Sequence, residues 1–188
     1  MNNSEYSMAQ TTVITECKNA LTLVDPEQVE VLIKAMEQAG TVFVIGVGRV
    51  MIAMEAWVKR FNHLGIPMIH VGALNEPALR PGDLLIVASG SGNTVVPVAI
   101  AKKAKSLGAV VGHICSSENG EVAKYRDFMV KIPVAKNGLP SDAVQSVQPM
   151  TSLFEQSVFL LGDIISLMLV ERRGEEKEKL WQCHANLE

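Results

Sequence analysis

Short apolar runs along the chain alternate with segments in which apolar residues recur at helical spacing. The runs "TVFVIG", "PMIHV", "LLIVAS", "AVVGHI" and "DFMVKIPV" are rich in β-branched residues and bounded by turn-forming residues, which predicts five strands. The helical patterns between and before them end at Gly40, Gly65 and Gly108. Strands that alternate with helices predict an α/β fold with a parallel sheet and helices on both faces.

The two ends of the chain also carry helical patterns. An amphipathic N-terminal helix is predicted over about residues 8–24, and a second helix over 151–170, which is apolar nearly all round. One small domain cannot cover all of these faces, so we expect the N-terminal helix and residues 150–188 to make subunit contacts. The polar stretch 135–150, with Gly, Pro and Ser, is predicted to be a long loop of the kind that is usually functional.

Length, charge and cysteine spacing narrow the class of protein. The 188 residues fit a single domain over 1–188, and a net charge of −3 provides no basic field, so no nucleic-acid partner is expected. The three cysteines show no CxxC spacing, which favours a reduced, cytoplasmic setting without a zinc site. The apolar stretch 157–170 is interrupted by Asp163 and is shorter than the roughly 20 residues of a membrane span, so no membrane partner is expected either.

Two glycine-containing loops follow predicted strands, where an open parallel sheet binds its ligands. The first is "GVGR", residues 46–49. It is not a dinucleotide fingerprint, because Met51 replaces the third glycine and His70 stands where an acidic residue would bind the ribose. A P-loop is excluded as well, since no Gly-Lys-Ser/Thr follows a predicted strand.

The second loop is "SGSGNT", in which Ser89, Ser91 and Thr94 carry hydroxyls. Its glycines let backbone N–H groups approach a ligand, and the helix that follows provides free N–H donors and a partial positive charge. A serine-rich capping turn is the alternative, but three hydroxyls in six residues exceed what capping needs. Without a lysine or metal ligands, the loop predicts a site for one phosphate monoester.

Here the residues carry a family resemblance. "SGSGNT" after an apolar strand resembles the phosphosugar loop of SIS (sugar isomerase) domains. "GVGR" before a helix that ends in "NHLG" is similar to the 6-phospho-3-hexuloisomerase branch, as are "PGDLLIVASGSGNT", "AKKAKSLGA", "SLFEQS" and the terminal "HANLE". The resemblance covers nearly the whole chain from Gly40 onward. It implies a flavodoxin-like SIS domain in a homo-oligomer, most often a tetramer.

The resemblance also implies an activity. Enzymes of this branch interconvert 3-hexulose 6-phosphate and fructose 6-phosphate, a step of the ribulose monophosphate pathway, by moving a proton between C2 and C3 through a cis-enediol. Such a site needs a base over one face of the sugar and groups that stabilise the oxyanion, but no metal or other cofactor. Two rivals stay open: an aldose–ketose isomerase, for example of pentose 5-phosphates, and a non-catalytic sugar-phosphate sensor. Sensors of this kind usually carry a DNA-binding module, and the predicted elements of this sequence include no helix-turn-helix segment outside the SIS domain.

The resemblance assigns candidate catalytic roles. Glu155 matches the glutamate that the family uses as base, although "SLFE" also has the spacing of a capping box, in which Glu155 would accept from the backbone N–H of Ser152. His63 is a candidate acid or ring-opening group in a neighbouring subunit's site; alternatively it bonds the last carbonyls of its own helix. His184 lies in the "HANLE" tail, which is expected to fold over an active site.

The remaining candidates are expected to bind substrate. Gly46, Gly48 and Arg49 form the first sugar-contacting loop by resemblance, and Arg49 is the only cation in either loop; a surface ion pair is its alternative role. Asn93 belongs to the phosphate loop, but it stands where the branch often has Glu, just as residues 50–51 (Val-Met) replace a common Ser-Gly. These differences bear on the exact substrate rather than on the fold. His70 and His113 fall within strand patterns and are expected to be core histidines.

Overall fold

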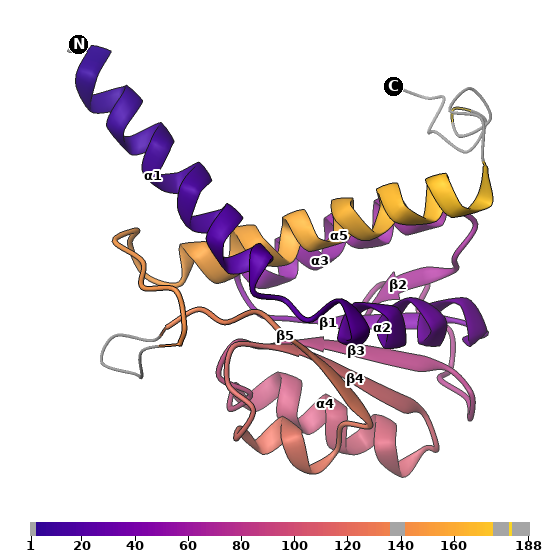
Figure 1. Ribbon diagram of the computed structural model, residues 1–188. Helices are drawn as coiled ribbons and strands as arrows, with labels where there is room; N and C mark the ends of the chain where they lie inside the picture. The colour runs from indigo at the N-terminus through magenta and orange to yellow at the C-terminus, as the bar shows by residue number, and fades with distance from the viewer. Residues whose placement is uncertain (1–2, 136–141, 175–180, 182–188) are drawn as a thin grey trace.

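The computed structural model describes residues 3–135, 142–174 and 181. A five-stranded parallel sheet lies at its centre, with strand order β2-β1-β3-β4-β5 (Figure 1). The strands are β1 Val42–Ile45, β2 Met68–His70, β3 Leu84–Ala88, β4 Val110–Cys115 and β5 Phe128–Lys131. This confirms the predicted flavodoxin-like sheet, because a 2-1-3-4-5 order is the doubly wound order of that fold.

Helices cover both faces of the sheet (Figure 1). They are α1 Asn3–Thr22, α2 Pro26–Gln38, α3 Arg49–His63, α4 Val95–Ser106, the short 3₁₀ helix η1 Glu121–Lys124, and α5 Ser152–Arg173. Alternate strand residues enter the two cores, since successive side chains of a strand point to opposite faces. Val44 packs in the core beneath α2, α3 and α5, while Phe43 packs in the core beneath α4.

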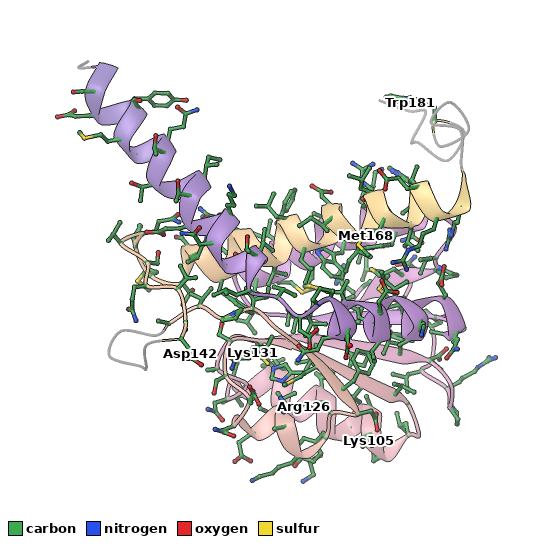
Figure 2. The ribbon with its side chains drawn as sticks, in the orientation of Figure 1. Lys105, Arg126, Lys131, Asp142, Met168 and Trp181 are labelled. Atoms are coloured by element: carbon green, nitrogen blue, oxygen red, sulfur yellow. The ribbon has the colours of Figure 1, made fainter. Side chains whose placement is uncertain are left out.

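The N-terminal helix is longer than its apolar pattern predicted. α1 begins at Asn3 rather than near residue 8, because no glycine or proline interrupts the polar residues ahead of the pattern. Residues 4–11 are all exposed. The first turns of α1 stand clear of the rest of the protein, with their side chains directed into solvent (Figure 2). Only the second half of the helix packs against α5 (Figure 1).

Close contact between α3 and α5 fixes the position of α5. The indole Nε1 of Trp57 donates to the carbonyl of Val158 at 2.9 Å. A Cβ on Gly162 would lie 2.2 Å from the same Nε1, so only glycine lets α5 settle onto the ring. Within the described residues α5 is also the one helix long and apolar enough to cross a membrane, a test that core helices pass as well; half of its most apolar stretch is buried.

Candidate active site

The sheet order brings the two predicted loops together. β1 and β3 are neighbours, with Ile45 beside Val87 near their carboxyl ends. The chain leaves β1 toward one face of the sheet, into α3, and leaves β3 toward the other face, into α4. This is the point where the strand order reverses, at which open α/β sheets bind their ligands. The loop 46–49 and the loop 89–94 therefore lie side by side at the carboxyl edge of the sheet, the place where such folds form their ligand crevice.

The first loop depends on both of its glycines. Gly46 is buried, and a Cβ there would lie 3.1 Å from the backbone nitrogen of Met51. Gly48 has a φ of 59° and a ψ of −133°, a conformation that side-chain-bearing residues avoid. It is the N-cap of α3 and provides no side-chain bond to the first turn. The helix N-terminus therefore opens directly into the crevice, with Arg49 as its first residue.

Two of the three hydroxyls of the second loop lie beside each other. The Ser89 and Thr94 hydroxyl oxygens are 3.2 Å apart, and the Ser91 hydroxyl accepts from the backbone N–H of Asn93 at 3.2 Å. The Asn93 side-chain oxygen accepts from the backbone N–H of Glu121 at 2.9 Å, which ties the loop to η1. Thr94 is the N-cap of α4, yet no side chain caps that helix. The loop is thus not a capping turn, and the first N–H groups of α4 have no side-chain acceptor.

A buried histidine supports this loop from behind. His113 is 1 % exposed, and its Nε2 lies 3.0 Å from the Ser89 carbonyl oxygen. Because a carbonyl only accepts, Nε2 carries the proton, and the buried Nδ1 has no hydrogen-bond partner within the described residues. Burial lowers the pKa of His113 to about 4; the nearby Arg126 lowers it further and the bond to Ser89 opposes the shift. His113 is buried as predicted, but only one of its nitrogens is hydrogen-bonded.

Two glycines let the loop pack closely on its support. A Cβ on Gly92 would lie 3.0 Å from the Cε1 of His113, and Gly92 itself has a φ of 65°. A Cβ on Gly120 would lie 2.3 Å from the carbonyl oxygen of Ser91. The backbone of the loop is therefore held between the imidazole and the chain that follows β4.

The start of α5 closes the crevice. Phe154 packs against the second loop, since a Cβ on Gly90 would lie 3.4 Å from its ring. One carboxylate oxygen of Glu155 accepts from Nε of Arg49, and the other accepts from the hydroxyl of Thr151 at 2.7 Å. The Glu155 side chain is 11 % exposed and that of Arg49 64 %. Glu155, Arg49 and the phosphate loop, predicted from separate motifs, thus meet in one place.

The capping box, the alternative role considered for Glu155, is not present. α5 begins one residue earlier than that motif requires, with Thr151 as N-cap, so Glu155 falls at the fourth helical position. Its carboxylate therefore lies over the Thr151 side chain, one turn before it, instead of the N–H of Ser152. The hydroxyl of Ser152 donates to the carbonyl of Pro149 at 2.8 Å. The ion pair considered for Arg49 does form, and its partner is the candidate base itself.

His63 is not brought to Glu155 of its own chain. His63 is the last residue of α3, whereas Arg49 is its first. At 1.5 Å per residue, this places His63 about 20 Å along the helix axis from the crevice of its own chain. His184 lies outside the described residues. His63 therefore stays a candidate for the site of a neighbouring subunit, as the resemblance implied.

One contact, which no sequence pattern predicts, holds the segment ahead of α5. Glu16 of α1 accepts from the Ser146 hydroxyl at 2.6 Å, the backbone N–H of Val147 at 2.9 Å and the side-chain amide of Gln148 at 2.9 Å. Burial raises the pKa of Glu16, but these bonds outweigh it and the pKa is lowered. More than 120 residues separate Glu16 from its partners, so no local sequence pattern could predict this contact.

The arrangement suits a phosphorylated substrate. The first turns of α3, α4 and α5 meet at the crevice, and none of them has a side-chain cap. Their free N–H groups and aligned dipoles favour an anion, to which Arg49 adds a full positive charge. Among the described residues, the Glu155 carboxylate is the group beside both loops that could accept a proton from a carbon acid bound there. The crevice can therefore hold a phosphate and offer a base to the attached carbon chain.

Comparisons with known proteins give the family. The SIS domain family matches residues 35–161. The 3-hexulose-6-phosphate isomerase of Bacillus subtilis is 31% identical and aligns over 94% of this chain and 95% of its own length; that of Mycobacterium gastri is 38% identical over 88% and 82%. A Methanococcus jannaschii protein, whose crystal structure infers a function of 3-hexulose-6-phosphate isomerase, superimposes with a TM-score of 0.80 at 26% identity, over 98% of this chain and 99% of that one.

These matches confirm the resemblance drawn from the two loops, "SLFEQS" and "HANLE", since 3-hexulose-6-phosphate isomerase and 6-phospho-3-hexuloisomerase are two names for one activity. They extend over nearly the whole of both proteins, so they concern more than a shared fold. The chain belongs to the SIS-domain family and, within it, to the 3-hexulose-6-phosphate isomerases.

Proposed function

We propose that this protein interconverts 3-hexulose 6-phosphate and fructose 6-phosphate in the cytoplasm, as a step of the ribulose monophosphate pathway. The observation that carries the proposal is the position of the Glu155 carboxylate beside the loop 89–94, which is followed by the uncapped N-terminus of α4. In a parallel sheet these two features need not coincide. Here the contact of Phe154 with Gly90 and the pair between Glu155 and Arg49 hold them together.

The proposed mechanism follows from this placement. The phosphate binds Ser91, Thr94 and the N-terminus of α4, and the carbon chain extends toward the loop after β1. Glu155 removes the proton from C2 of the 3-ketose, which gives a cis-enediolate with its negative charge on O3. The hydroxyl proton then passes from O2 to O3 through the cis-enediol stage, and Glu155 returns its proton to C3, which leaves a carbonyl at C2 and a hydroxyl at C3. Arg49 stabilises the negative charge that develops on the substrate oxygens. One carbon is oxidised and its neighbour reduced, so the reaction balances without an external redox partner.

A panel of sugar phosphates tests the activity. We expect fructose 6-phosphate to form from 3-hexulose 6-phosphate, and pentose 5-phosphates to be poor substrates. Val50 and Met51 replace a Ser-Gly that is common in this branch, but both side chains pack against the core. The replacement is therefore compatible with the hexulose phosphate as substrate. Faster turnover of a pentose 5-phosphate would support the aldose–ketose alternative, and tight binding without turnover of any sugar would support a sensor.

Loss of a hydroxyl from the phosphate loop is expected to weaken substrate binding. Ser91→Ala and Thr94→Ala should each raise KM by about 5- to 30-fold, which corresponds to the loss of a hydrogen bond worth about 1–2 kcal/mol. Ser106→Ala is the matched control, because this hydroxyl lies at the other end of α4 and donates only to the carbonyl of Lys103. If all three variants share the wild-type KM, the loop does not bind the phosphate.

We also propose that the whole chain, as one SIS domain, assembles into a homo-oligomer, by resemblance a tetramer. α5 exposes a row of apolar side chains, namely Phe159, Leu160, Ile164 and Leu167. The projecting part of α1 adds Tyr6 and Met8, which are 74% and 62% exposed. Exposed apolar side chains that gather on one helix mark an interaction site, and a second copy carries the matching face.

Light scattering at micromolar concentration is expected to give a multiple of the 20.4 kDa chain mass. Leu167→Glu should lower that mass, because it places a charge on the exposed face of α5. Glu55→Gln, an exposed change on α3, is the control and should leave the mass unchanged. A wild-type monomer would contradict this prediction and, with it, any role for His63 in a neighbour's site.

A further inference from the structure

Thr151 occupies an unusual position for an N-cap residue. The hydroxyl of a threonine at this position normally accepts from a backbone N–H in the first turn of its helix. Here it makes no such bond. Instead it contacts Glu155 at 2.7 Å, and because a carboxylate has no hydrogen to give, the hydroxyl is the donor. Thr151 therefore leaves a backbone N–H of α5 uncapped and hydrogen-bonds to the candidate base.

The contact completes the set of partners that orient the carboxylate. Arg49 binds one oxygen of Glu155 and Thr151 binds the other. Each carboxylate oxygen has two lone pairs, so both partners can stay in place while a substrate proton is accepted. Arg49 reaches Glu155 through a long side chain that is largely exposed. Thr151 sits one turn earlier on the same helix, so its short side chain gives the more rigid contact.

The chain around Thr151 is held in an uncommon conformation. Met150, directly before it, is the one non-glycine residue in the described ranges with a positive φ, 57°, and its side chain is 96% exposed. A strained residue of this kind persists only where its surroundings fix it. The fixing contacts are those of Glu16 with residues 146–148, together with the bond from Cys17 Sγ to the Gln156 side chain at 3.3 Å.

We propose that Thr151 is a positioning residue for the isomerisation, whose hydroxyl holds the Glu155 carboxylate in the orientation from which it removes the substrate proton. The inference rests on the proposed role of Glu155 as base. The proposed phosphate site, at Ser91, Thr94 and the N-terminus of α4, does not include Thr151. Its loss therefore acts on kcat and leaves KM nearly unchanged, because the phosphate loop is unaffected.

Valine is the sharpest replacement, since it keeps the shape of threonine and lacks the donor. Thr151→Val is expected to lower kcat by about 10- to 100-fold, as the loss of a hydrogen bond to a charged group in the reaction would. KM should stay within about twofold. Thr151→Ser restores the hydroxyl and should recover most of kcat. Because Thr151 is exposed, neither change is expected to unfold the protein, which thermal melts would check.

Ser152→Ala is the matched control, because it removes the neighbouring hydroxyl, which donates only to the carbonyl of Pro149. It should retain the wild-type kcat. An equal loss of kcat in Ser152→Ala and Thr151→Val would mean that the helix start matters and the contact with Glu155 does not. Wild-type kcat in Thr151→Val, or no recovery in Thr151→Ser, would also overturn the proposal.

A double variant separates this proposal from the proposed function. In a Glu155→Gln background, Thr151→Val should cause no further loss of kcat, because its effect passes through the carboxylate. A full additional loss would show that Thr151 acts on something else, with Glu155 still the base. If Glu155→Gln alone has wild-type kcat, the role of Glu155 itself is refuted, whatever Thr151 does.

Discussion

Glu155→Gln is expected to lower kcat by roughly 100- to 10,000-fold, the usual worth of a positioned general base. The hydrogen on C2 of a ketose phosphate is weakly acidic, so its removal near neutral pH needs a carboxylate fixed beside it. Glutamine keeps the size of the side chain and offers no such base. Binding of the phosphate should persist, because the loop that follows β3 is unchanged. KM is therefore expected to move little, and steady-state kinetics on 3-hexulose 6-phosphate would measure both.

The stability of this variant should be close to that of the wild type. The lost ion pair involves an arginine whose side chain is 64 % exposed, and exposed pairs contribute at most about 1 kcal/mol. The amide oxygen of glutamine can still accept from the Thr151 hydroxyl. Glu30→Gln is the matched control: it breaks an ion pair between α2 and α5, with Arg172, at the opposite end of α5. This control should keep full activity.

The same experiment separates an enzyme from a sensor. A sensor needs the phosphate loop but no base, so Glu155→Gln would leave its ligand response intact and there would be no turnover to lose. An isomerase with another base would keep a wild-type kcat in this variant. In that case His63 and His184 would be the next residues to replace.

The sequence predicted the sheet and the meeting of the two loops because both follow from local patterns. Buried parallel strands are continuous apolar runs, and all five runs form strands. The loops after β1 and β3 share an edge because parallel strands end on the same side. The start of α2 is local in the same way: the Asp25 carboxylate, directly before Pro26, accepts from the backbone N–H of Glu27 at 2.9 Å. Resemblance, rather than pattern, identified Glu155.

The details of the site depend on features that no local pattern contains. Whether Glu155 caps its helix or faces Arg49 depends on a shift of one residue in the start of α5, and the tertiary contacts of residues 146–148 decide it. The support of the phosphate loop by His113 links residues 24 positions apart through the packing of neighbouring strands. The sequence pattern around a histidine in a strand is the same whether its side chain only packs in the core or also hydrogen-bonds to a loop, as His113 does.

His113 is expected to make the stability of the protein depend on pH. Its pKa is about 4 in the folded protein, against 6.5 for the free side chain. Below pH 6.5 the unfolded chain therefore binds a proton that the folded protein does not bind until the pH reaches about 4. The contribution is fully present above pH 6.5 and is lost as the pH falls through this range. The loss amounts to about 3 kcal/mol in the free energy of unfolding.

Urea unfolding of the wild type and of His113→Gln, at several pH values and one protein concentration, would measure this loss. Carboxylates titrate in both proteins, so the difference between the two isolates His113. Glutamine can still donate to the Ser89 carbonyl but has no proton to gain. The wild type should thus lose about 3 kcal/mol more than the variant between pH 7 and pH 4. Parallel curves would mean that His113 is solvated, because burial is the main cause that keeps this imidazole from taking up a proton at pH 5.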